Sequence, residues 1–186
     1  MDQASASDAV AALNARAIAM GWGMRCYEDL DFVEPELNAF RDVWRARAGK
    51  TGLASRADFD ARTLKQFLPH VSLMERVAGA YGDWRYRVRL SGSALSHLLG
   101  EQTGRYLDEF IPEPFLERWT AGYDTVLASA RPLRVVSRFE LPLLRLLDGE
   151  SILVPLANGS AAPHMILGAL YVTHKQAHRD PTQQVA

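Results

Sequence analysis

The chain has 186 residues, of which 48% are hydrophobic, with 21 basic and 22 acidic side chains. This length suits one domain with an added terminal element, and a net charge of −1 excludes a global field that would recruit nucleic acid or an anionic membrane. A single cysteine, Cys26, excludes an internal disulfide and every multi-cysteine metal site. The N-terminus lacks a basic region followed by an apolar stretch, and no apolar run is long enough to span a bilayer, so we expect a cytoplasmic protein.

The first part of the chain predicts two helices. Apolar residues recur at helical spacing up to Met20, which predicts a helix from Ser7 or Asp8 that packs on its own domain or on a second copy. Residues 26–33 are acidic and are expected to be irregular. Pro35 then suits the first turn of a second helix, which should end at Gly49. Its buried stripe comprises Leu37, Phe40, Val43 and Trp44.

The rest of the chain predicts five strands and two further helical segments. The strands are expected at 71–77, 84–90, 133–144, 151–157 and 165–173, with short helices after Gly92 and a longer helix over 112–130. Gly92 is expected to supply a turn conformation closed to other residues, and Ser93 to cap the helix that follows it. We therefore predict an α+β fold, in which a five-stranded antiparallel sheet carries helices on one face, plus N-terminal helices. The expected divisions are an N-terminal helical extension (1–33), the main domain (34–175) and a flexible tail (176–186).

Six short segments, spread in order from about Leu37 to Tyr171, resemble a bacterial PAS family common in alphaproteobacteria. They are Trp44-x-x-Arg47, Ser55-Arg56-Ala57-Asp58-Phe59-Asp60, Leu68-Pro69-His70-Val71, Tyr86-Arg87-Val88-Arg89-Leu90-Ser91-Gly92-Ser93, Thr103-Gly104-Arg105 and Leu153-Val154-Pro155-Leu156. The resemblance implies a sensor fold whose interior, between sheet and helices, is either packed solid or able to hold a small molecule.

Candidate residues for such an interior come from the strands and helices that should enclose it. They are Tyr86, Val88, Leu95, His97, Leu98, Arg105, Trp119, Tyr123, Phe139 and Leu153. Of these, Arg105 offers a fork for a carboxylate, although a structural salt bridge with Asp108 or Glu109 is the preferred interpretation. Likewise, Arg85, Arg87 and Arg89 are expected to pair with acids on other strands, including Glu75 and Glu140.

The sequence predicts no cofactor. Haem-type PAS sensors usually place their ligand in the long helix, where this chain has Trp119 and Tyr123 and no histidine. Flavin photoreceptors with the PAS fold carry a reactive cysteine at the place where this chain has Glu101-Gln102-Thr103-Gly104-Arg105. The spacing of the histidines, which are His70, His97, His164, His174 and His178, does not favour a metal site.

Three functions are compatible with these features. The preferred hypothesis is a non-enzymatic sensory and signalling module that binds a small ligand, a protein partner or both. The N-terminal helix is the expected contact with a second copy, in a homodimer, or with a signalling partner. We expect no binding to nucleic acid or to a membrane. The alternative is a ligand-free adaptor with a filled interior. A cone-like hydrolase or isomerase would require an acid-histidine pair, for which Asp108 and His97 are the candidates; no catalytic residue is otherwise expected.

Overall fold

A computed structural model describes residues 3–80, 82–113, 115–141, 145–159 and 162–173, without the side chains of 3–6, 139–141, 145–147 and 173. Its α-helices are α1 (Gln3–Ala19), α2 (Pro35–Ala48), α3 (Ser93–Leu99) and α4 (Phe115–Ser129). Its strands are β1 (Met24–Tyr27), β2 (Ala54–Ser55), β3 (Val71–Ala78), β4 (Trp84–Ser91), β5 (Leu133–Leu141), β6 (Arg145–Ala157) and β7 (Met165–Thr173). No helix among these residues is both long and apolar enough to cross a membrane. His174, His178 and the predicted flexible tail (176–186) lie outside the described residues.

The strands form one sheet in the order β1-β5-β6-β7-β3-β4, with every neighbouring pair antiparallel. All five predicted strands are present, although β6 begins at Arg145 and not at residue 151, and residues 142–144 of the predicted third strand lie outside the described residues. The described residues add two short strands. Of these, β2 lies parallel to β6, and β1 pairs with β5, Cys26 opposite Val135. The expectation that Cys26 and Tyr27 are irregular is therefore wrong. The Asn14 side chain supports β1 by hydrogen bonds to both the amide and the carbonyl of Cys26, each 2.8 Å long.

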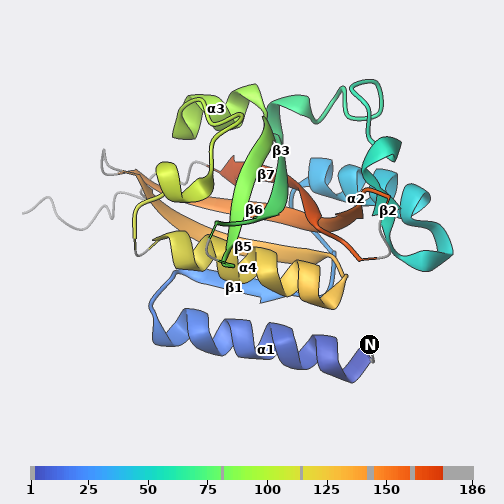
Figure 1. The fold of residues 1–186 in the computed structure, drawn as a ribbon. Helices are drawn as coiled ribbons and strands as arrows, with labels where there is room; N and C mark the ends of the chain where they lie inside the picture. Colours follow the sequence, from blue (N-terminus) through green and yellow to red (C-terminus); the bar gives the residue numbers. More distant parts are fainter. Residues whose placement is uncertain (1–2, 81, 114, 142–144, 160–161, 174–186) are drawn as a thin grey trace, which may run out of the picture.

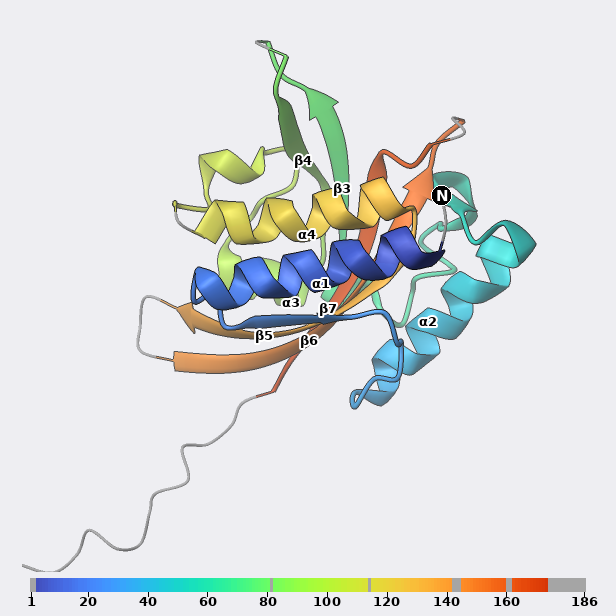
Figure 2. The same cartoon turned by 90° about the horizontal axis from the view of Figure 1, so that it is seen from below.

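Helices cover both faces of the sheet (Figures 1 and 2). On one face, α2 packs against β2, β6 and β7, and its Phe40 and Trp44 belong to a core that includes Leu73 of β3. On the other face, α4 packs against β6 and β7, and the next residue of β3, Met74, belongs to that second core. Alternation along the strands thus supplies two cores. The helix coverage of the α2 face was not predicted, because a sheet buried on one face only was expected.

The N-terminal helix packs on its own domain. It runs beside α4 in Figure 2, with Leu13 and Ala17 buried and an ion pair between Arg16 and Glu117 of α4. Ile18 and Met20 at its end are 79% and 52% exposed. The packing of α1 therefore leaves apolar side chains in solvent where the helix ends.

The turn before α3 differs from its prediction in two respects. Gly92 has φ −67°, a conformation that any residue adopts, so backbone freedom is not what requires glycine there. Instead, a Cβ atom at this position would lie 2.2 Å from the carbonyl oxygen of Leu68 and 2.4 Å from that of Pro69. Ser93 is the first residue of the helix and its side chain caps nothing, so the predicted N-cap is wrong.

Candidate ligand cavity

A cavity of about 80 Å³ lies between the sheet and helices α3 and α4. Most of its walls are apolar, with a smaller number of polar groups. The lining residues are Met24, Ser72, Met74, Leu95, Leu99, Gln102, Arg118, Trp119, Gly122, Tyr123, Val135, Ser137, Ser151, Leu153, Gly168, Ala169 and Leu170. Such a mixture, an apolar lining with a few convergent polar groups, is typical of small-molecule sites.

Small residues leave this space open. In α4, Gly122 faces the sheet, where an added Cβ atom would come no closer than 4.0 Å to Leu153 Cδ1. Opposite, on β7, a Cβ atom at Gly168 would lie 3.1 Å from Ser72 Oγ and 3.2 Å from Leu153 Cδ2. The Leu153 side chain therefore lies close to both glycines, and neither glycine adds a side chain of its own to the space.

Four of the predicted interior residues line the cavity: Leu95, Trp119, Tyr123 and Leu153. Two others, Tyr86 and Val88, are buried in the adjoining core but do not line it. The Tyr86 ring lies 5.2 Å from the Tyr123 ring, and its hydroxyl donates to Asp124. Phe139 lies in β5, and its side chain is outside the described residues.

Three predicted residues lie away from the described cavity walls. Leu98 is in α3 and half-buried but does not line the cavity, and His97 is exposed, with Nδ1 2.7 Å from the carbonyl oxygen of Ser93. Arg105 is also exposed; it donates to the carbonyl of Glu109 and lies 3.9 Å from its carboxylate, which confirms the structural salt bridge. The positions of these residues, in α3 and in the loop after it, predicted that they lie near the cavity. They did not predict whether each side chain faces the cavity.

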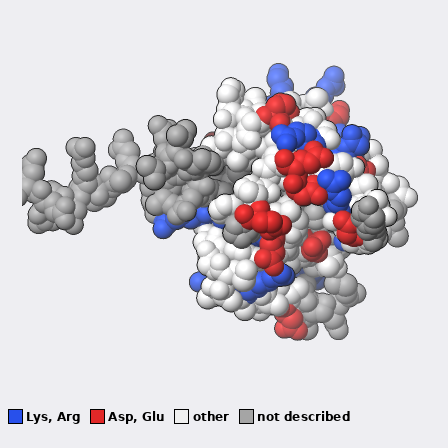
Figure 3. Space-filling model, turned by 60° about the vertical axis from the view of Figure 1, so that its left-hand side comes forward, with Lys and Arg blue, Asp and Glu red and all other residues white. Residues whose placement is uncertain are grey.

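The proposed acid-histidine pair is not formed by the described side chains. Asp108 accepts two hydrogen bonds from Arg85, 2.8 and 2.7 Å long, and that guanidinium lowers the pKa of Asp108. Arg89 pairs with Glu75 across the hairpin, as expected. One face of the molecule accordingly shows acidic and basic side chains side by side (Figure 3). The described residues contain no group of three or more His, Cys, Asp or Glu side chains that could hold a metal ion.

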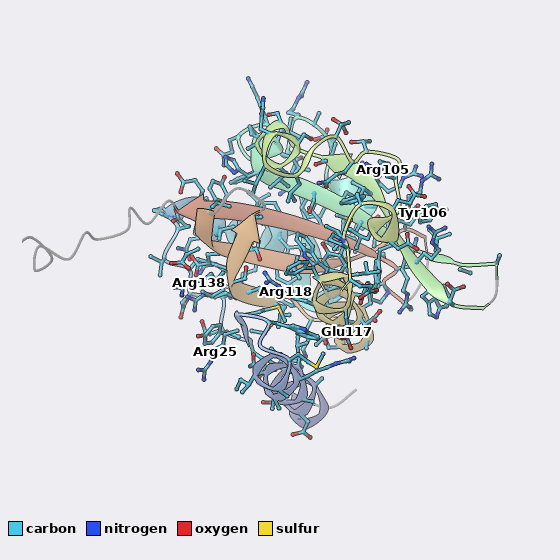
Figure 4. The ribbon with its side chains drawn as sticks, turned by 90° about the vertical axis from the view of Figure 1, so that its left-hand side faces the viewer. Arg25, Arg105, Tyr106, Glu117, Arg118 and Arg138 are labelled. Atoms are coloured by element: carbon cyan, nitrogen blue, oxygen red, sulfur yellow. The ribbon has the colours of Figure 1, made fainter. Side chains whose placement is uncertain are left out.

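Arg118 is the principal residue that the sequence interpretation missed. It is only 7% exposed, lines the cavity, and donates from Nη1 to the carbonyls of Trp22, at 2.8 Å, and Arg138, at 3.2 Å. Burial lowers its pKa. In Figure 4 it lies at the start of α4 between α1 and the sheet, apart from Arg105 and Tyr106. Helical spacing offered one signal, because Arg118 lies one turn before Gly122 on the inward side of α4.

Burial also sets the chemistry of two other groups on this face. It raises the pKa of the Cys26 thiol to about 12, against a smaller lowering by Arg118. It raises the pKa of Tyr123 as well. Both groups are neutral at physiological pH. Cys26 lies in the adjoining core, and among the described residues that line the cavity Arg118 is the charged one.

The size of the cavity restricts what it holds. At about 80 Å³ it exceeds the roughly 10–15 Å³ that one water molecule needs. It is well below the roughly 300 Å³ at which ordinary ligand pockets begin. The observed walls therefore suit a molecule of a few heavy atoms, with an apolar body and a group that accepts hydrogen bonds from Arg118.

Comparison with known proteins gives one family and several similar structures. A family model described as a PAS domain matches residues 33–171. An RNA-binding light-oxygen-voltage receptor is 14% identical, with a TM-score of 0.43 over 68% of this chain and 36% of that one. The Rhodobacter sphaeroides LOV protein is 16% identical, also with a TM-score of 0.43, over 64% of this chain and 71% of that one. This chain thus spans about a third of the first structure's length, and no curated protein matches it significantly.

Proposed function

The chain belongs to the PAS domain family, and we propose that it is a non-enzymatic sensory module whose cavity between sheet and α4 binds a small ligand. The observation that carries this proposal is the apolar cavity with a buried arginine in its wall. An apolar site with one cationic donor favours a compact molecule that has a hydrogen-bond acceptor at one end. The acceptor on the ligand would meet Arg118, and its body would lie against Leu95, Trp119 and Leu153.

Arg118 also supplies a route by which binding changes the surface. Its Nη1 holds the carbonyl of Trp22, which lies in the turn between α1 and β1. A ligand that draws the guanidinium toward the cavity weakens this hydrogen bond, and the turn loosens. The exposed end of α1, with Ile18 and Met20, then changes its position against α4. The signal leaves through that surface, to a second copy or to another signalling protein.

Native mass spectrometry of the full chain tests the ligand step. Wild-type protein should carry a small molecule that Gly122→Leu excludes, because the new side chain projects into the cavity. Ala128→Leu is the matched control: Ala128 is exposed on the same helix and lines neither the cavity nor its mouth. Retention of the same mass by Gly122→Leu would contradict the proposal, as would the absence of any bound mass in the wild type.

The second candidate is a ligand-free adaptor, and the exposed Ile18 and Met20 are the observation that favours it. In that case the double variant Ile18→Glu, Met20→Glu should dissociate an oligomer in sedimentation velocity while Gly122→Leu leaves it unchanged. Trp84→Glu is the control, since Trp84 is an exposed apolar residue on β4, at the sheet edge opposite β1. A change of oligomeric state on filling the cavity would favour the sensor over the adaptor.

A further inference from the structure

A second cavity, of about 250 Å³, lies at the seam where α1, α2 and the end of α4 meet. We call it the seam cavity; its lining includes Val10 of α1, Trp44 of α2 and Val126 of α4. No described residue lines both this cavity and the one between sheet and α4. It therefore concerns a different site from the one in the proposed function.

Trp44 contributes a hydrogen-bond donor to this region. The residue is 5% exposed, and its Nε1 is buried and donates to none of the described residues. Buried polar groups in folded proteins nearly always have a hydrogen-bond partner, and each exception calls for an explanation. Because Trp44 also lines the seam cavity, a ligand with an acceptor atom is a direct explanation.

The charged residues around the seam cavity favour an anion. Arg45, Arg131 and Glu28 line it, and all three are exposed. Two basic residues against one acidic residue attract a negative charge. A ligand with a single carboxylate matches this excess, because Arg45 is also shared with Asp42, whose pKa is lowered by Arg41 and by Arg45.

The remaining walls are apolar. Leu30 and Leu133 are buried and line the cavity together with Val126, so a ligand that filled it would remove apolar surface from water. Arginine forks match the two oxygens of a carboxylate, and an indole N–H donates to the same group. We propose that the seam cavity binds a small monocarboxylate with an apolar body, whose carboxylate accepts from Trp44 Nε1 and pairs with Arg45 and Arg131.

Nuclear magnetic resonance of the indole N–H groups tests this proposal on the full chain, which has four tryptophans. Sodium benzoate is the probe, with benzamide as its neutral analogue and inorganic phosphate as an anion without an apolar body. Benzoate should shift the Trp44 indole resonance saturably and leave that of Trp84, on the distant hairpin, unchanged. Arg45→Gln and Arg131→Gln should each weaken binding about tenfold, as expected for the loss of a charge-assisted hydrogen bond. Arg62→Gln, an exposed arginine outside the cavity lining, should not weaken it.

Trp44→Phe removes the donor and keeps most of the ring. Benzoate binding, followed by saturation transfer to the ligand, should weaken about tenfold in this variant while its melting transition remains cooperative. Equal shifts by benzamide or phosphate would overturn the assignment to monocarboxylates, and the absence of a saturable Trp44 shift would overturn the site. A shift of Trp119 in place of Trp44 would overturn it too, and would instead support binding in the cavity between sheet and α4.

Discussion

The two faces of the sheet are built from the same strands but packed in opposite ways. The α2 face holds most of the largest side chains that are fully buried, among them Phe40, Phe59 and Phe67. The α4 face has glycines and serines at the corresponding central positions and a cavity of about 80 Å³. On the α2 face, close packing of large side chains stabilises the fold. On the α4 face, smaller side chains leave a cavity, which reduces the packing contacts there. Within the sheet itself, the α2 face is therefore the more closely packed one, and the α4 face carries the cavity that we propose binds a ligand.

The largest expected effect comes from truncating the packed face. Phe40 is fully buried and meets Phe67 edge to face, with ring centroids 5.3 Å apart. Phe40→Ala should lower the free energy of unfolding by about 3–5 kcal/mol in urea titrations. The matched variant on the other face, Leu153→Ala, should cost near the lower end of the about 2–5 kcal/mol range, since Leu153 already borders a cavity. A greater loss for Leu153→Ala would contradict the contrast between the faces.

A smaller effect is expected where the chain enters α2. The Glu150 carboxylate is buried; it accepts hydrogen bonds from the amides of Val33 and Glu34 and pairs with Arg134 at 2.7 Å. Glu150→Gln should lower the free energy of unfolding by about 1.5–3 kcal/mol, because these are charge-assisted bonds. Glu75→Gln, which breaks a more exposed pair with Arg89, should cost less than about 1 kcal/mol in the same titration. Equal costs would mean that burial of Glu150 does not matter.

Alkaline pH should lower the free energy of unfolding through Cys26, a buried group of the α4 face. Burial raises the pKa of Cys26 from 9.0 to about 12, so folding requires the neutral thiol. Its contribution to stability is fully present below pH 9 and is lost as pH rises toward 12. Between these values Cys26→Ala should lose less stability than the wild type, measured by urea titration at each pH. In the native wild type a disulfide reagent at pH 8 should label the thiol only as fast as the protein unfolds.

The smallest effect is a stabilisation. Gly122→Ala should raise the free energy of unfolding by about 0.5–1 kcal/mol, because alanine is the better helix residue and its methyl group has room. Gly168→Ala, across the same cavity, should show no gain, since its methyl group would crowd Ser72 and Leu153 at 3.1–3.2 Å. Thermal melting of the two variants side by side measures the difference. Stabilisation of both would mean that the cavity walls yield more easily than the contacts indicate.

Sequence alone identified the five longer strands, the long helix and the family, because each of these depends on local periodicity and short motifs. Strand alternation at Tyr86 and Val88 predicted burial correctly. The alternation did not show that these two residues lie beside the cavity and not in its wall. A periodic pattern predicts only that a residue faces inward, whether it meets a packed core or a cavity. The same limit applies to His97, whose helix was predicted but whose outward orientation was not.

Tertiary structure decided the site. The position of Arg118 depends on the packing of α1 beside α4, which brings the Trp22 carbonyl within 2.8 Å of its guanidinium. This hydrogen bond joins residues that are 96 positions apart in the sequence. Gly122 leaves room beside Leu153 only because α4 packs against β6 and β7. Local patterns determine which residues turn inward, but the distances between elements depend on long-range packing. That packing, and not the pattern, determines which inward residues form a solid core and which surround a cavity.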